Sequence, residues 1–294
     1  MDDQQQYEEH LMQEIIDLAL KEDHVSRDVT TNSLLEYDNP VLATVTAKEA
    51  GVISGIQPFI ATFKTVDAGT SVKVLAGDGC QVQKGDVVMA IEGMESSILK
   101  AERTALNFLQ RLSGIASLTK SFTDKLKPFH TTLLDTRKTT PGMRYLEKRA
   151  VKHGGGTNHR LNLEDMAMIK DNHIEMAGSI PAAVQAIRKR FPGKKIEVEV
   201  KNLAELQETL ELEVEMIMLD NFSVGLLEEA VQLVRQWKNG RRPQLEISGN
   251  VSLDNIEQKA AVGVDFISVG ALTHSFKSLD LSLNITQRAP KDKR

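Results

Sequence analysis

Positively charged side chains gather in one stretch of an otherwise acidic sequence. Between Arg137 and Lys170 the chain has eight Lys or Arg residues and two His residues, but only three acids. The same stretch contains the glycine run 154–156, which allows the backbone to approach a ligand closely. Guanidinium and ammonium groups bind carboxylates and phosphates through charge-assisted hydrogen bonds. The stretch therefore predicts a site for a small anionic molecule.

Two members of this stretch follow an apolar run directly. Arg137 and Lys138 come after residues 131–135, so we expect them at the rim of a strand end. An Arg can grip a carboxylate or phosphate with two parallel hydrogen bonds, and a Lys adds a mobile point charge. A solvated basic loop is the alternative interpretation of such a pair. His159, Arg160 and Lys170 extend the same positive lining.

The second half of the chain must position these residues. Strand-like runs at 131–135, 166–170, 195–200, 215–220, 244–248 and 265–270 alternate with amphipathic helical segments, which predicts parallel strands with helices outside. Polar residues or glycines end these runs at intervals of 29, 21, 28 and 22 residues: Lys170, Glu199, Asp220, Ser248 and Gly270. In a parallel barrel all strand carboxyl ends open on one face, where catalytic loops collect. We therefore expect these residues to converge.

The acids and glycines at the strand ends suggest how phosphate groups are held. Glu199 and Asp220 offer hard oxygen ligands, which suit a Mg²⁺ ion that also touches substrate phosphates. Structural salt bridges from these acids to Lys201 or Lys170 are the alternative. The segments 248–250 and 269–271 follow the last two strands, a frequent place for backbone N–H groups to bind a phosphate.

The first half of the chain predicts a small mixed domain. Residues 7–20 have the apolar spacing of a surface helix, residues 41–91 consist of short β-rich pieces between glycines, and residues 95–123 predict a long helix. The hairpin sequence at 82–88 resembles that of biotinyl and lipoyl carrier domains. Its neighbouring turn has no modifiable Lys before Lys100, so a carrier or phosphate-sensing module is the weaker, non-catalytic hypothesis.

Composition limits the class of protein. The 294 residues are 41% hydrophobic and 26% charged, which allows a full core and two domains. A net charge of −5 argues against a nucleic-acid-binding surface, and the longest nearly apolar run, 260–272, is too short to span a membrane. The single Cys80 and the absence of a signal-like opening segment favour a cytoplasmic location.

Several motifs together resemble the quinolinate phosphoribosyltransferase family. The most specific are DTRKTTPG at 135–142 and KHGGGTNHR at 152–160, and weaker matches extend over nearly the whole chain. The resemblance implies an α/β fold: an N-terminal α/β sandwich of the hammerhead type over 1–115 and an incomplete TIM-like α/β barrel over 116–274, with 275–294 packing back on the first domain. It also implies a dimer with shared active sites, and leaves larger assemblies such as a hexamer open.

The activity implied by the resemblance is a pentosyl transfer in NAD biosynthesis. Quinolinate and phosphoribosyl pyrophosphate would give nicotinate mononucleotide, CO₂ and pyrophosphate, with Mg²⁺ as cofactor and with no nucleic-acid or membrane partner. A related transferase that accepts another aromatic acid is the alternative enzyme. The high number of Arg and Lys residues in the stretch favours a doubly charged acid.

The resemblance also assigns residues to roles. Arg137, His159, Arg160 and Lys170 would hold quinolinate, with Arg103 reaching the pocket from a neighbouring subunit. Lys138, Glu199 and Asp220 would serve phosphoribosyl pyrophosphate and Mg²⁺, and Lys138, Lys170, Glu199 and Asp220 would be catalytic. Thr136, Ser248, Gly249, Asn250, Ser268, Gly270 and Ala271 would complete substrate binding. Two positions depart from the family pattern: Arg27 precedes Asp28 where Gly is usual, and Asn250 stands where many members have Gly.

Overall fold

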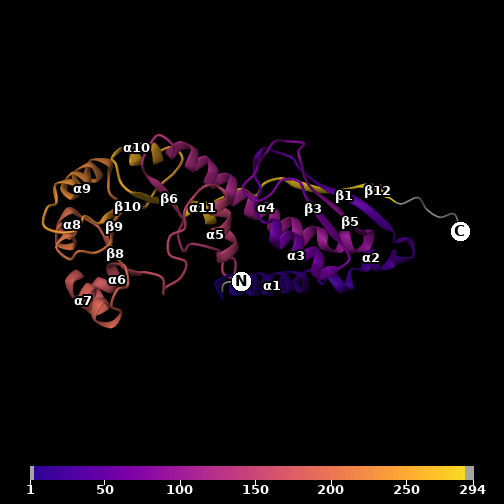
Figure 1. Cartoon of the computed structure of the whole chain (residues 1–294), viewed down its shortest axis with the longest axis horizontal. Coiled ribbons are helices and arrows are strands. Elements are labelled where there is room, and N and C mark those ends of the chain that lie inside the picture. Colours follow the sequence, from indigo (N-terminus) through magenta and orange to yellow (C-terminus); the bar gives the residue numbers. More distant parts are fainter. Residues whose placement is uncertain (1–2, 289–294) are drawn as a thin grey trace. The chain divides into compact units, whose positions relative to one another are not determined.

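The computed structural model describes residues 3–288, which form two compact units (Figure 1). The N-terminal unit contains the chain up to residue 120, residues 139–155 and the chain from residue 276 on. The barrel unit contains residues 121–138 and 156–275. The segment 275–294 is predicted to pack back on the first domain. Its last six residues, 289–294, lie outside the described residues.

A four-stranded antiparallel sheet forms the centre of the N-terminal unit. Its order is β12 (Leu281–Arg288), β1 (Pro40–Ala47), β5 (Val87–Met94) and β3 (Ser71–Val74), and β2 (Gly51–Val52) pairs separately with β4 (Gln81–Val82). Alternate residues of β1 point into the core, as the β-rich sequence predicts. The last described strand, β12, pairs along the length of β1, so the chain returns to its first sheet.

Helices accompany this sheet. They are α1 (Asp3–Glu22), α2 (Val29–Ser33), α3 (Ile56–Val66), α4 (Glu95–Leu126) and α5 (Arg144–His153), with short 3₁₀ turns η1 (Val25–Arg27) and η2 (Leu35–Tyr37). The helices predicted at 7–20 and 95–123 are confirmed as α1 and α4. Helix α3 was not predicted, because its residues lie in a stretch that reads as β-rich. Phe59 and Phe63 on α3 are fully buried, with ring centres 5.0 Å apart.

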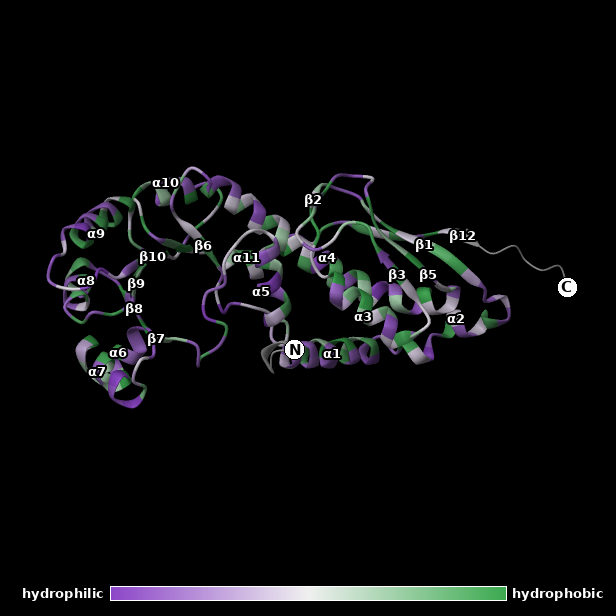
Figure 2. Ribbon diagram, viewed as in Figure 1, coloured by the Kyte–Doolittle hydropathy of each residue, from purple (hydrophilic) through white to green (hydrophobic). Residues whose placement is uncertain are grey.

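The barrel unit is built on six parallel strands. Their order is β6 (Thr132–Leu134), β11 (Phe266–Ser268), β10 (Gln244–Ser248), β9 (Met216–Asp220), β8 (Ile196–Val200) and β7 (Ala167–Ile169). All six fall within the predicted runs. The first and second strands of the unit, β6 and β7, lie at opposite edges of the sheet and are not paired with each other, so the predicted incomplete barrel is confirmed (Figure 2).

Helices connect the barrel strands. They are α6 (Asp171–Ala177), α7 (Ile180–Arg190), α8 (Leu203–Leu210), α9 (Val224–Gln236), α10 (Ile256–Ala261) and α11 (Ala271–His274). Helix α9 is typical: hydrophobic and hydrophilic residues alternate along it (Figure 2), and its buried residues, Leu227, Ala230, Val231 and Val234, follow helical spacing. None of the helices within residues 3–288 is long and apolar enough to cross a membrane.

Candidate active site

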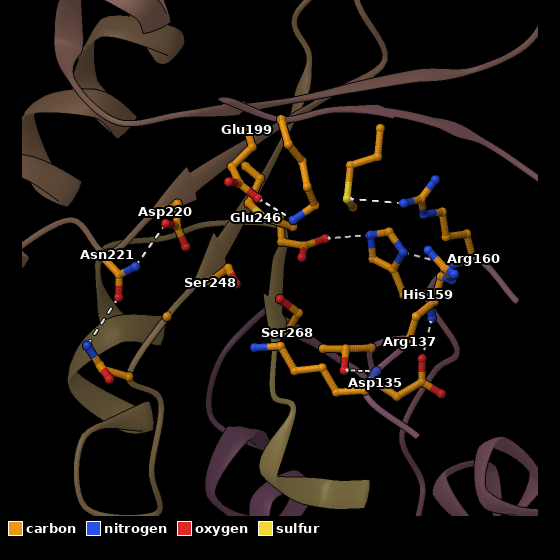
Figure 3. A pocket seen from close by; sticks show the side chains of 17 residues that line it. Asp135, Arg137, His159, Arg160, Glu199, Asp220, Asn221, Glu246, Ser248 and Ser268 are labelled. Atoms are coloured by element: carbon orange, nitrogen blue, oxygen red, sulfur yellow. Dashed lines mark hydrogen bonds and ion pairs between the residues drawn. The ribbon is translucent and has the colours of Figure 1, made fainter. Parts of the chain in front are cut away.

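A cavity of about 610 Å³ lies at the carboxyl ends of the barrel strands (Figure 3). Residues far apart in the sequence meet here because parallel strands end on one face. Most residues predicted for the site line this cavity: Thr136, Arg137, Lys138, His159, Arg160, Lys170, Glu199, Asp220, Ser248, Gly249, Asn250 and Ser268. Five lining residues were not predicted: Asp135, Met168, Met218, Asn221 and Glu246.

Three predicted residues are not among the lining residues. Gly270 lies behind Lys138, since a Cβ on Gly270 would come within 3.0 Å of the Lys138 Cδ atom, and Ala271 is the first residue of α11. Arg103 belongs to the N-terminal unit, where it lines a separate cavity of about 270 Å³ with residues of α1 and α4. Gly154 also belongs to that unit and packs against the backbone carbonyl of Ala116.

Asp135 organises the cationic side of the cavity. Its side chain is fully buried and accepts hydrogen bonds from the Asn158 side chain at 2.6 Å and from the His159 amide at 2.8 Å. These bonds tie the segment before β7 to the end of β6. The segment carries His159 and Arg160 into the cavity (Figure 3). A buried carboxylate in the cavity wall thus positions the neighbouring cations.

The two arginines of the cavity are held differently. The Arg160 guanidinium donates to the Met166 carbonyl at 3.0 Å. Burial, and then the nearby charge of Arg137, lowers the pKa of Arg160, as expected where like charges crowd together. The buried Nε of Arg137 has no hydrogen-bond partner among residues 3–288. An unpaired buried donor of this kind is costly unless a ligand accepts from it.

Lys170 and Glu199 form an ion pair across the ends of β7 and β8. Their Nζ and Oε2 atoms are 2.6 Å apart, with the Glu199 side chain 11% exposed. Lys201 instead pairs with Asp171, at 3.0 Å. The salt bridge considered as an alternative for Glu199 is therefore present, and both of its residues line the cavity.

A chain of amides joins Asp220 to the glycine loop after β10. Asn221 donates to Asp220 at 2.8 Å and accepts from the Asn250 side chain at 3.1 Å (Figure 3). Gly249 has φ of +88°, and a Cβ there would overlap the Asn221 side chain. Only glycine therefore allows the loop to come this close to Asn221.

Helix α10 fixes the same loop from behind. Lys259 donates to the Gly249 carbonyl and the Asn255 side chain donates to the Asn250 carbonyl, both at 2.8 Å. Burial lowers the pKa of Lys259, although the charge of Asp220 opposes this shift. Helix α10 and the residue before it thus hold the loop carbonyls, and Ser248, Gly249 and Asn250 line the cavity.

His159 faces two buried acids. Its Nε2 lies 3.0 Å from Glu197 and 3.3 Å from Glu246, both of which are fully buried. Burial lowers the pKa of His159, but hydrogen bonds and charges from the two acids outweigh burial and raise this pKa to about 9. The Arg160 amide donates to Nδ1 at 2.8 Å and opposes protonation there, but one neutral donor is weaker than two carboxylates. Burial raises the pKa of Glu197.

This site defines a class of protein. The cavity is cationic, has two carboxylates and a glycine loop at its rim, and lies at the strand ends of a parallel barrel. Such a cavity is the site of an enzyme that binds small polyanions.

Two buried acids that were not predicted could have been found from the alternation of side chains along a strand. Glu197 and Glu246 stand two residues before Glu199 and Ser248, and therefore point to the same side of their strands.

Comparisons with known proteins identify the family. The family model described as the quinolinate phosphoribosyl transferase C-terminal domain matches residues 115–284, and the model of the N-terminal domain matches residues 28–113. Together the two models cover most of the chain. The chain belongs to the quinolinate phosphoribosyltransferase family.

Individual relatives agree with this assignment. The chain is 46% identical over 242 residues to a probable nicotinate-nucleotide pyrophosphorylase (carboxylating) of Synechocystis, covering 82% of this chain and 81% of the relative. The Mycobacterium leprae enzyme is 39% identical, with 91% and 94% covered. The solved structure of the nicotinate-nucleotide pyrophosphorylase from Francisella tularensis matches with a TM-score of 0.89 at 38% identity, covering 94% and 96% of the two chains.

Proposed function

We propose that the cavity carries out decarboxylating phosphoribosyl transfer: quinolinate and phosphoribosyl pyrophosphate are converted to nicotinate mononucleotide, CO₂ and pyrophosphate. The observation that carries the proposal is the gathering of four cationic side chains and two rim carboxylates in one cavity: Arg137, Lys138, Arg160, Lys170, Glu199 and Asp220. Both substrates carry several negative charges, and this lining complements them.

Quinolinate would occupy the cationic side of the cavity. Arg137 has an unpaired buried Nε, and Arg160 and His159 lie beside it. Lys170 would contribute one of its protons to a carboxylate while its Glu199 bond holds it in place. Each charge-assisted hydrogen bond contributes about 1.5–3 kcal/mol, so three or four of them favour a dianion over a monoacid by a large margin.

Phosphoribosyl pyrophosphate would lie across the other strand ends. Its 5-phosphate would bind Ser248, Gly249, Asn250 and Ser268, which line the cavity, and Gly270 and Ala271 follow Ser268 closely in the chain. Thr136 would contact the same substrate. Lys138, whose carbonyl accepts from the Thr273 hydroxyl at 2.9 Å, would reach the pyrophosphate. Fixing both substrates on one face supplies the proximity that the reaction needs.

Glu199 and Asp220 suit a Mg²⁺ ion. Both line the cavity, come from the neighbouring strands β8 and β9, and present hard carboxylate oxygens. A bound Mg²⁺ supplies charge neutralisation for the pyrophosphate leaving group. The Asn221 hydrogen bond orients the Asp220 carboxylate. Another group of three residues close enough for a metal within the described residues is His159, Glu197 and Glu246, in which His159 forms an ion pair with each acid.

The chemistry needs no organic cofactor. Lys138 stabilises the departing pyrophosphate as the bond to ribose C1 breaks, which leaves an oxocarbenium-like centre. The pyridine nitrogen of quinolinate, held by Arg137 and Arg160, then forms the new bond to C1. The ring nitrogen becomes cationic, and its positive charge stabilises the electron pair that stays on C2 when CO₂ leaves. A proton from solvent or from Lys170 then completes nicotinate mononucleotide.

Purified protein supplied with quinolinate, phosphoribosyl pyrophosphate and Mg²⁺ tests the proposal. We expect stoichiometric release of nicotinate mononucleotide and CO₂, measured by chromatography and by trapping of labelled carboxylate. Omitting Mg²⁺ or adding a chelator should reduce the rate. Faster turnover of nicotinate or another monoacid than of quinolinate would assign the site to a different aromatic acid, and no turnover with any acid would refute the transferase.

Arg103 would act in a dimer with shared sites. It lies on α4 of the N-terminal unit, and we propose that it completes the quinolinate pocket of a second copy of the chain. Mixing an Arg103→Ala chain with an Arg137→Ala chain should restore about a quarter of the activity, because a hybrid dimer regains one intact site. Absence of recovery despite confirmed subunit exchange would contradict the shared site.

A cytoplasmic location is proposed from cysteine usage alone.

A further inference from the structure

Two buried acids stand beneath a cavity that is lined with cations. Glu197 on β8 and Glu246 on β10 are both fully buried, and Glu246 reaches the cavity lining. Negative charge below a site for a dianion repels the ligand unless it is neutralised. Burying a carboxylate without a partner is also unfavourable for folding. Both acids therefore require an explanation that the transfer reaction does not supply.

The strand neighbours of the two acids do not provide a counter-charge. Met168 and Met216 stand beside Glu197 in the register of β7, β8 and β9. Met218 and Phe266 stand beside Glu246 in the register of β9, β10 and β11. None of these four side chains carries a charge or donates a strong hydrogen bond. The partner of both acids must come from outside the strands.

That partner is His159, on the segment that lies across the open side of the barrel. Its Nε2 is 3.0 Å from a Glu197 oxygen and 3.3 Å from a Glu246 oxygen, and its side chain is 6% exposed. Within the described part of the chain, the four carboxylate oxygens have no hydrogen-bond partner, so the ion pairs with His159 are what neutralises the two acids. Figure 3 shows the ring of His159 directed at Glu246, with Arg160 and Arg137 close by.

The other edge of His159 is engaged by the backbone that carries Arg160. The Arg160 amide donates to Nδ1 at 2.8 Å, and the His159 amide donates to buried Asp135 at 2.8 Å. The imidazole therefore connects the acids inside the barrel to the backbone of the cation segment. A displacement of the ring would displace Arg160 as well.

We propose that Glu197 and Glu246 are positioning residues for the aromatic diacid, which act on it only through His159 by holding the ring and the Arg160 backbone against the cavity. This inference rests on the proposed function and adds residues to it. Glu197 is not among the residues that line the cavity, and the Glu246 side chain in the cavity wall is directed at the imidazole. They favour a positively charged imidazole and fix where that charge lies.

Replacing one acid by the neutral glutamine distinguishes positioning through His159 from direct charge repulsion between the acid and the ligand. If the acids merely repelled the ligand, Glu197→Gln or Glu246→Gln would remove a negative charge and tighten quinolinate binding. If they act through His159, the same change loosens the ring and weakens binding. We expect the KM for quinolinate to rise about tenfold in either variant, which corresponds to one charge-assisted hydrogen bond. The KM for phosphoribosyl pyrophosphate should change less than about twofold, because its loops lie on other strand ends.

Glu215→Gln is the matched control. Glu215 precedes β9 and its side chain accepts from the Ile196 amide at 2.8 Å, at the amino end of β8 and away from the cavity. The control makes the same change of charge beside the same strand and should leave both KM values unaltered. Thermal unfolding of each variant verifies that it is folded. If the glutamine variants do not fold, Glu197→Asp and Glu246→Asp keep the charge but withdraw the oxygens from Nε2, and should give the same selective rise.

A double-mutant cycle with His159→Asn tests whether the acids act through the imidazole. If the acids act through the imidazole, Glu197→Gln should have no further effect on the KM for quinolinate in the His159→Asn background, or should lower it. Equal effects in both backgrounds, tighter quinolinate binding in the single variants, or parallel rises of both KM values would overturn the proposal. These outcomes leave the transferase activity itself intact, whereas an inactive wild-type protein would refute the proposed function first.

Discussion

The two units of the chain bury charged residues in different places: in the N-terminal unit Glu147 and Lys148 are buried on α5, outside its main core cluster. The main core cluster of the N-terminal unit consists of apolar residues from its sheet, α3 and α4. The interior of the barrel unit contains three fully buried acids: Asp135, Glu197 and Glu246. The first unit is stabilised by removing apolar area from water. The second unit keeps ionisable groups inside where they orient the residues of its cavity, so a substitution in each interior should affect a different property.

Phe59→Ala should give the largest effect on stability. Phe59 is fully buried against Phe63, and truncating a buried aromatic side chain costs about 3–5 kcal/mol of unfolding free energy. The KM for quinolinate should stay unchanged in the protein that remains folded. Urea unfolding and steady-state kinetics on the same sample measure both quantities. A large change in KM at unchanged stability would break the contrast between the units.

Raising the pH should destabilise the barrel unit. The pKa of His159 is raised from 6.5 to about 9, so the stabilisation from its protonation is present below pH 6.5 and is lost as the pH rises through 9. Burial raises the pKa of Glu197 to about 7, so this acid also loses its proton within the range. The unfolding free energy should therefore fall by about 3 kcal/mol between pH 6.5 and pH 9. Chemical unfolding across this range measures the slope. His159→Gln should flatten it, and an unchanged slope in that variant would assign the titration to another group.

Arg137→Ala should reduce catalysis with little effect on folding. The Arg137 Nε has no protein partner within residues 3–288, so its removal breaks no hydrogen bond of that nitrogen in the free protein. We expect kcat/KM for quinolinate to fall about ten- to a hundredfold, and the unfolding free energy to change by less than about 1 kcal/mol. Arg137→Lys should recover only part of the activity, because the two-pronged geometry of the guanidinium is lost.

Asn250→Gly should have the smallest effect. Asn250 has φ of +49°, which glycine adopts more readily, but the change removes the hydrogen bond to Asn221. These effects oppose each other, so we expect the KM for phosphoribosyl pyrophosphate to change by about twofold or less. Asn221→Ala serves as the comparison. It removes the bonds to both Asp220 and Asn250 and should raise that KM further.

Local patterns predicted much of the barrel unit. Each of its strands lies in an apolar run, and parallel strands bring their ends together without further information. Helix α3 shows where local patterns fail. Its sequence, IQPFIATFKTV, includes β-branched and aromatic residues that favour strands, yet burial of Phe59 and Phe63 decides the conformation. Tertiary packing of this kind is invisible to propensity.

The sequence predicted the charged residues at the rim of the cavity but not the buried acids beneath them. Arg137, Lys138 and Lys170 stand out by charge and by position after a strand. Glu197 and Glu246 were overlooked because a charged residue inside a strand normally indicates the solvent side. Their burial depends on the curvature of the open sheet and on His159, which lies far away in the sequence. The contribution of Asn221 to the site was not predicted, because it depends on how closely Gly249 approaches the Asn221 side chain.

The gap between β6 and β7 has a consequence for how new specificity can arise. Thr157 runs beside β6 as an isolated parallel bridge to Leu134, and the chain then continues as an irregular segment that carries His159 and Arg160. Ladder pairing does not constrain this segment beyond the bridge. Grafting another sequence between residues 158 and 165 could thus redirect acid preference while the ribose-phosphate half of the enzyme is retained.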